Sequence, residues 1–82
     1  MELIVGDRTI PSRALFRVAH GIEAFLSGSA VLPVLDAAFH ATARIEVRGC
    51  DLDDRLLEVS GIEMQGAETR VTLIYRESGK HH

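Results

Sequence analysis

The apolar residues between positions 12 and 27 recur at the interval of an α-helix. Four of them, Leu15, Val18, Ile22 and Phe25, are spaced by three, four and three residues. This spacing brings side chains onto one face of a helix. Ser12 suits the N-cap, and Gly28 suits the left-handed residue that follows a helix end. The pattern predicts a helix over residues 12–27 whose apolar face packs on the core.

Gly21 fits this predicted helix badly, because glycine in a helix interior costs about 1 kcal/mol relative to alanine. One interpretation is a tolerated defect on the exposed side. The other is the close approach of a second backbone, such as that of another subunit. The position of Gly21 away from the apolar face favours the first interpretation.

A second, shorter helix is predicted over residues 33–41. Pro33 suits its first turn, and one broad face carries Val34, Leu35, Ala38, Phe39 and Ala41. Two amphipathic helices joined by a short link that contains glycine predict a helical hairpin or an angled pair.

The two ends of the chain have the composition of strands. Residues 3–5 and 9–10 flank the turn signal Gly6-Asp7, which predicts a small hairpin or one edge strand with a loop. From Ala43 the apolar period becomes two, which predicts strands over residues 43–48, 56–64 and 69–76. The alternation slips at Ser60-Gly61, where a β-bulge would return Leu57, Val59, Ile62 and Met64 to one face.

These elements predict a single small α+β domain over residues 1–82. Its order is β(β)ααβββ: a short N-terminal strand or hairpin, two helices, and a three-stranded antiparallel meander covered on one face by the helices. An 82-residue chain lies near the size at which one core is only marginally sufficient, which favours association.

Composition narrows the class of protein. The net charge of −3 disfavours a general polyanion binder. The sequence has no 18-residue apolar run, no signal-peptide pattern and a single cysteine, Cys50, so we expect a cytoplasmic protein without an intrachain disulfide. Arginine outnumbers lysine eight to one, which fits a GC-rich bacterial genome. His81 and His82 fit the start of a purification tag, so we do not expect them to belong to a site.

Two polar pairs are the candidate catalytic residues. Asp36 and His40 are four apart on the second helix, a spacing that lets a carboxylate orient an imidazole, and His20 and Glu23 are three apart on the first. Such pairs are more often solvated helix pairs worth a few tenths of a kcal/mol. They lie away from the apolar faces, so convergence on a divalent metal would need a subunit contact. We therefore expect neither a metal nor a cofactor.

Two other groups of residues are interpreted as surface. Cys50 lies beside Asp51, Asp53 and Asp54, whose carboxylates disfavour a reactive thiolate, and this acidic turn lacks the spacing of an EF-hand. A stripe on the outer sheet face would contain Arg44, Arg48, Arg70 and Arg76. Neighbouring glutamates would neutralise the stripe, and no aromatic side chain accompanies it to stack a base, so nucleic-acid binding is not favoured.

The favoured function is that of a small non-enzymatic module that associates with copies of itself, as a homodimer first, and then with a protein partner. A contiguous exposed apolar patch formed by Leu56, Ile74 and Phe16 motivates this expectation. One alternative is a small-ligand-binding protein or small enzyme with a pocket at a subunit interface. A second alternative is nucleic-acid binding through the arginine stripe.

Overall fold

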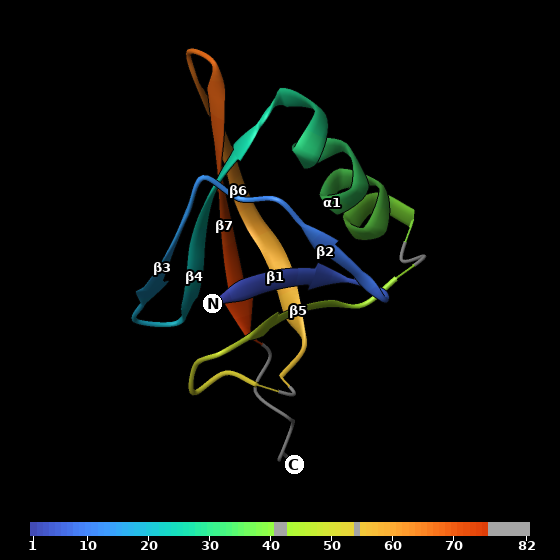
Figure 1. Cartoon of the computed structure of the whole chain (residues 1–82), viewed down its shortest axis with the longest axis vertical. Helices are drawn as coiled ribbons and strands as arrows, with labels where there is room; N and C mark the ends of the chain where they lie inside the picture. The colour runs from blue at the N-terminus through green and yellow to red at the C-terminus, as the bar shows by residue number, and fades with distance from the viewer. Residues whose placement is uncertain (41–42, 54, 76–82) are drawn as a thin grey trace.

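The computed structural model of the chain describes residues 1–40, 43–53 and 55–75. Its elements are β1 (Glu2–Val5), β2 (Arg8–Ile10), β3 (Ala14–Val18), β4 (Gly21–Ser27), α1 (Gly28–His40), β5 (Ile45–Arg48), β6 (Leu57–Gln65) and β7 (Glu68–Tyr75). The strands form two antiparallel sheets, with the orders β2-β1-β5 and β3-β4-β7-β6. Figure 1 shows the strands of the smaller sheet running across those of the larger one, with α1 along one side.

The core lies between the two sheets and α1. Leu3 and Val47 from the three-stranded sheet, and Ile22 and Leu73 from the four-stranded sheet, are fully buried. Val34 is the fully buried side chain that α1 contributes. Strand alternation explains this arrangement, since every second residue of β4 and β7 points inward, which leaves one whole face of the larger sheet turned outward.

The predicted helix over residues 12–27 is wrong. This segment forms β3 and β4, an antiparallel hairpin with a turn at residues 19–20. Leu15 pairs with Ala24 and faces the core, whereas Val18 and Phe25 point to the opposite face. The long pairing of β4 with β7, from Gly21 to Ser27, supplies backbone partners that outweigh the local helical spacing.

Gly21 has a different role from the one favoured by the sequence. A Cβ at this position would lie 1.7 Å from the carbonyl oxygen of Leu73, which rules out any side chain without backbone movement. The approaching backbone belongs to β7 of the same chain, where Ile74 is the register partner of Gly21. Close backbone approach was therefore the correct alternative, but no second subunit is needed for it.

A helix does occur after residue 27, but its bounds differ from those predicted. Gly28, expected to end a helix, instead begins α1, and Pro33 lies inside the helix rather than in its first turn. A proline there removes one i→i−4 hydrogen bond, which α1 tolerates because its other face is anchored by buried Val31 and Val34. No helix in the described part of the chain is both long and apolar enough to cross a membrane.

The three-stranded meander is also wrong. β5 pairs with β1 in the smaller sheet, while β6 and β7 pair with each other and β7 pairs with β4. The predicted strands were each largely correct in extent, but the alternation within a strand carries no information about its neighbour. One helix rather than two packs on the sheets among the described residues.

Several local predictions are confirmed. β1 and β2 form the N-terminal hairpin around Gly6, whose φ of 67° suits the turn. β6 has a register shift between Val59 and Gly61, where the bulge was expected. Past this bulge, Ile62 and Met64 do share the face of buried partners on β7, yet both remain exposed.

We predict that Gly21→Ala will destabilise the fold by at least about 2 kcal/mol, because the new methyl group overlaps the β7 backbone. Gly28→Ala is the matched control, since a Cβ at Gly28 meets nothing within 4 Å, and it should change the free energy of unfolding by less than about 1 kcal/mol. Urea denaturation followed by circular dichroism measures both values. Equal stability of the two variants would contradict the close approach.

Candidate functional site

The outward face of the four-stranded sheet carries an apolar surface, which we call the outer patch: Phe16, Val18, Phe25 and Ile74. Phe16 is 52% exposed and Ile74 is 37% exposed. The rings of Phe16 and Phe25 meet edge to face, with centroids 5.7 Å apart. Val18 and Ile74 flank Gly21 in register, and this glycine presents no side chain between them. The described residues leave this surface open to water.

Charged groups beside the outer patch are paired with one another. Arg70 on β7 lies 4.0 Å from a carboxylate oxygen of Glu23 and also contacts Glu63. Arg13 and Glu68 form a further pair at 2.6 Å. Each of these charged side chains has a partner of opposite charge. Covering the outer patch would therefore not bury any of them without a partner.

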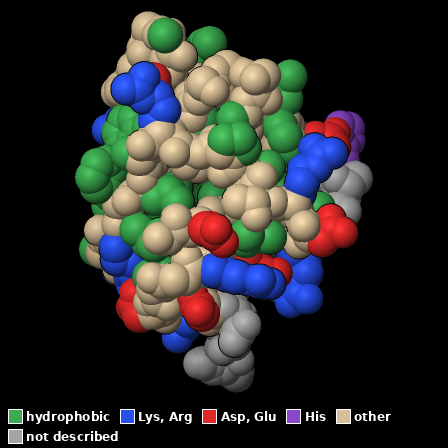
Figure 2. All heavy atoms as spheres, in the orientation of Figure 1, with side chains coloured by type: hydrophobic (Ala, Val, Ile, Leu, Met, Phe, Trp, Pro, Cys, Tyr) green, Lys and Arg blue, Asp and Glu red, His purple; other side chains and the backbone are tan. Residues whose placement is uncertain are grey.

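The charges of the rest of the molecule are unevenly distributed. In the orientation of Figure 1, charged side chains gather in the lower half of the visible face, around β5 and the β1–β2 turn (Figure 2). Hydrophobic side chains gather on the side of β3.

The predicted patch of Leu56, Ile74 and Phe16 is found in part. Phe16 and Ile74 point to the same outward face, two strands apart. Leu56 is 41% exposed but precedes the paired residues of β6. The sequence missed Phe25 and Val18, which were assigned to the buried face of a helix.

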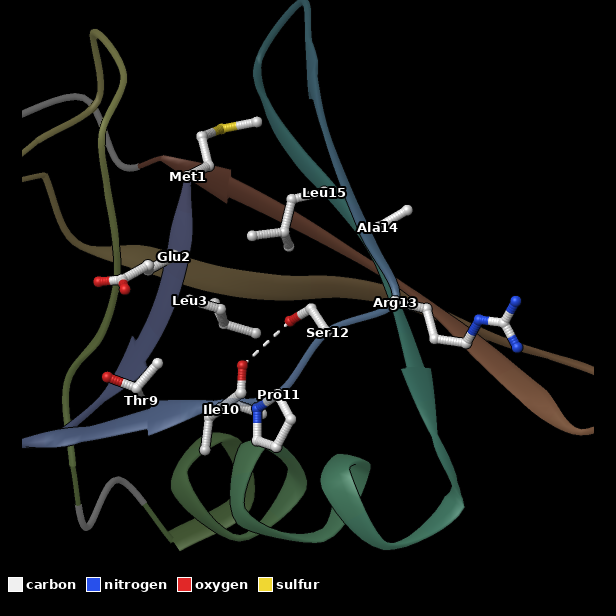
Figure 3. Close-up of a pocket in the computed structure, with 10 residues that line it drawn as sticks. All are labelled: Met1, Glu2, Leu3, Thr9, Ile10, Pro11, Ser12, Arg13, Ala14 and Leu15. Atoms are coloured by element: carbon white, nitrogen blue, oxygen red, sulfur yellow. Dashed lines mark hydrogen bonds between the residues drawn. The ribbon is translucent and has the colours of Figure 1, made fainter.

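A hollow of about 420 Å³ lies where β2 and β3 diverge. Leu3, Ile10 and Leu15 line it, and the Ser12 hydroxyl at its wall donates a hydrogen bond to the Ile10 carbonyl oxygen at 3.2 Å. Figure 3 shows that Glu2 and Arg13 point away from this space. Its lining is thus polar as well as apolar, and the two charged side chains at its rim do not converge on it as a catalytic pair would.

Asp36 and His40 form the predicted pair on α1, with 3.7 Å between His40 Nε2 and Asp36 Oδ1. Both side chains are 66% exposed, which is the geometry of a solvated helix pair. Asp36 lines a second, open hollow of about 610 Å³ between α1 and the β1–β2 turn, whereas His40 does not. The pair therefore does not converge on an enclosed site.

His20 and Glu23 are not helix neighbours. His20 is exposed in the β3–β4 turn, where its carbonyl oxygen accepts a hydrogen bond from the backbone N–H of Tyr75, and Glu23 points outward from β4. The β3–β4 turn and α1 lie on different sides of the molecule (Figure 1). Within residues 1–40, 43–53 and 55–75, no three His, Cys, Asp or Glu side chains are close enough to hold a metal.

The predicted arginine stripe is divided between the two sheets. Arg48 belongs to β5 and Arg44 precedes it, whereas Arg70 belongs to β7 in the other sheet. Arg76 lies outside the described residues. The stripe depended on the meander, so it does not exist in the predicted form.

The turn after β5 behaves as a structural loop. Asp53 Oδ1 accepts hydrogen bonds from the backbone N–H groups of Gly49 and Cys50, at 2.8 and 3.2 Å. Cys50 is half-buried, and its sulfur accepts a hydrogen bond from the backbone N–H of Leu52. The predicted solvated turn is therefore held by its own acidic side chain, while Asp54 lies outside the described residues.

A polar cluster that the sequence did not predict joins the β3–β4 turn to the β5–β6 loop. Arg17 donates two hydrogen bonds to Asp51, at 2.9 and 3.2 Å, and its Nη1 donates to the carbonyl oxygens of Val18 and Gly21. The guanidinium groups of Arg17 and Arg55 lie 5.9 and 4.8 Å from the centroid of the Tyr75 ring. Arg17 and Asp51 are 34 positions apart, and no local pattern signals the contact.

The hydrogen bonds from Arg17 hold the pKa of Asp51 below its ordinary value. A lowered pKa in the folded state stabilises the fold above the unfolded pKa, and this contribution is lost as the pH falls through the folded pKa. We predict that Arg17→Gln will raise the Asp51 pKa toward its ordinary value. Arg55→Gln should raise this pKa much less, because the charge of Arg55 lowers it less than the hydrogen bonds from Arg17 do. Carboxyl ¹³C NMR titration measures both, and equal shifts would refute the assignment.

Comparison of the chain with protein-family models, with curated proteins and with solved structures gave no match. Function is therefore inferred from the surface and charges of the chain itself. The outer patch is the feature of this molecule that is most unusual for a water-exposed sheet face.

Proposed function

We propose that this chain is a small non-enzymatic module that associates with a second copy of itself through the outer patch. The observation that carries this proposal is the exposure of Phe16, in edge-to-face contact with Phe25, on a sheet face that the described residues leave uncovered. Burial of apolar area contributes about 25 cal/mol per Å², so covering such a surface favours association.

The size of the chain supports the same proposal. A domain of 82 residues buries a smaller share of its surface than a larger one, and its core here is mostly aliphatic. Association through the outer patch adds buried apolar area without requiring any change of fold. Aromatic side chains are also enriched at the centres of protein interfaces, where they contribute much of the binding energy.

Exposed apolar side chains also occur elsewhere, on α1 at Leu32 and Phe39 and on β6 at Met64. Two of these side chains lie on the helix and one on β6, so the three do not share one sheet face as the residues of the outer patch do. The outer patch instead joins four apolar side chains across three paired strands, and the neighbouring charges Glu23, Glu63 and Arg70 are matched within the chain. It therefore suits a flat, self-complementary interface best.

We predict that Phe16→Glu will weaken self-association at least about tenfold, because it places an unpaired carboxylate in the buried interface. Phe39→Glu is the matched control: it makes the same change at an aromatic side chain that is 76% exposed on α1, and it should leave association unchanged. Light scattering over a micromolar concentration series measures the mass, and circular dichroism checks that both variants fold.

Two results would overturn the proposal. One is a wild-type protein that remains monomeric throughout the concentration series. The other is equal weakening by Phe39→Glu and Phe16→Glu, which would show that the outer patch has no special part in association.

A further inference from the structure

The four-stranded sheet ends in two edge strands, β3 and β6, and these edges differ. β6 is interrupted by its bulge between Val59 and Gly61, which opposes pairing with another strand. β3 has no register shift over its five paired residues, and its outward side chains are all apolar: Ala14, Phe16 and Val18. An uninterrupted edge of this kind is a template for strand addition.

The one charge within β3 is already satisfied inside the chain. Arg17 has the inward parity of Leu15, and such a charge normally protects an edge from pairing. Here Asp51 accepts two hydrogen bonds from its guanidinium group, and the carbonyl oxygens of Val18 and Gly21 accept two more. Arg13, just before the strand, is paired with Glu68. Neither arginine therefore protects this edge with a bare charge.

We infer that β3 of one copy pairs antiparallel with β3 of a second copy, which joins the two four-stranded sheets into one continuous sheet of eight strands. This inference rests on the proposed self-association, and it names the backbone contact by which the two copies meet. Main-chain hydrogen bonds along the edge supply directional attraction. Phe16 of each copy then lies against Phe16 of the other, so the contact buries the β3 side of each outer patch.

Charge selects the register of this pairing. Opposed residues in an antiparallel pair must point to the same face of the sheet. In a symmetric pair of β3 strands, one residue must therefore lie opposite its own copy, and the two-fold axis passes between these two copies. An axis at Arg17 places the two copies of Arg17 opposite each other, and an axis at Leu15 places Arg13 opposite Arg17. An axis at Phe16 avoids both clashes, because Arg17 then lies opposite Leu15.

The register centred on Phe16 also uses the whole strand. Phe16 lies opposite its own copy, and Ala14 lies opposite Val18, so every outward pair is apolar. On the inward side, Leu15 lies beside the aliphatic stem of Arg17, a favourable contact for both. Like residues thus meet on the apolar face while like charges are kept apart.

The register is tested by disulfide trapping between two variants of the full chain, Ala14→Cys and Val18→Cys, each with Cys50→Ser. Opposed residues in an antiparallel pair lie within disulfide reach, whereas Ala14 and its own copy would be displaced by four residues, about 14 Å along the strand. In an equimolar mixture under mild oxidation, the mixed disulfide should exceed either homodisulfide at least about tenfold by mass spectrometry. The homodisulfides serve as the internal control.

Amide hydrogen exchange of the unsubstituted chain gives a second measurement. Protection of the β3 amides that face away from β4 should rise at concentrations where light scattering reports the dimer. A dimer with a statistical mixture of disulfides, or with no rise in β3 protection, would overturn the strand pairing and leave the outer-patch proposal standing. A monomer at all concentrations would overturn both.

Discussion

The pairing of β4 with β7 is the contact on which the rest of this fold depends. It runs from the register partners Gly21 and Ile74 to Ser27 and Glu68, and it brings together strands from opposite halves of the chain. Ile22 lies opposite Leu73, and both are fully buried. Because α1 begins at the residue after β4, the same pairing also determines where the helix starts. The absent side chain of Gly21 is what allows the two backbones to approach at one end.

The failure of the helix prediction over residues 12–27 has a geometrical cause. The 3-4-3 series contains two pairs that are seven residues apart, Leu15 with Ile22 and Val18 with Phe25. A hairpin that turns at residues 19–20 places the first pair on the inward face and the second on the outward face. A helix would place all four together. Only the partner strand decides between these outcomes, and β7 lies far away in the sequence.

Several predictions that depended on a few neighbouring residues within one strand or turn succeeded. The turn at Gly6, the bulge next to Gly61 and the inward direction of Leu73 each follow from a few consecutive residues, and the structure confirms them. In the outer patch, the outward direction of Ile74 was correctly predicted from the alternation along its strand. Phe16 was expected to be exposed on a helix and is exposed on an edge strand instead. The link between Arg17 and Asp51 exists only in the folded chain, so no spacing could indicate it.

The bulge in β6 has a consequence for the size of any assembly built on this sheet. A sheet with two equally adhesive edges adds further copies at both ends, which is the geometry of a fibril. In the dimer proposed above, the symmetric contact at β3 would use the same edge of both partners, and only the two β6 edges of the joined sheet would then face outward. The register shift between Val59 and Gly61 makes those edges irregular. We therefore expect growth by strand addition in this proposed assembly to close at two copies.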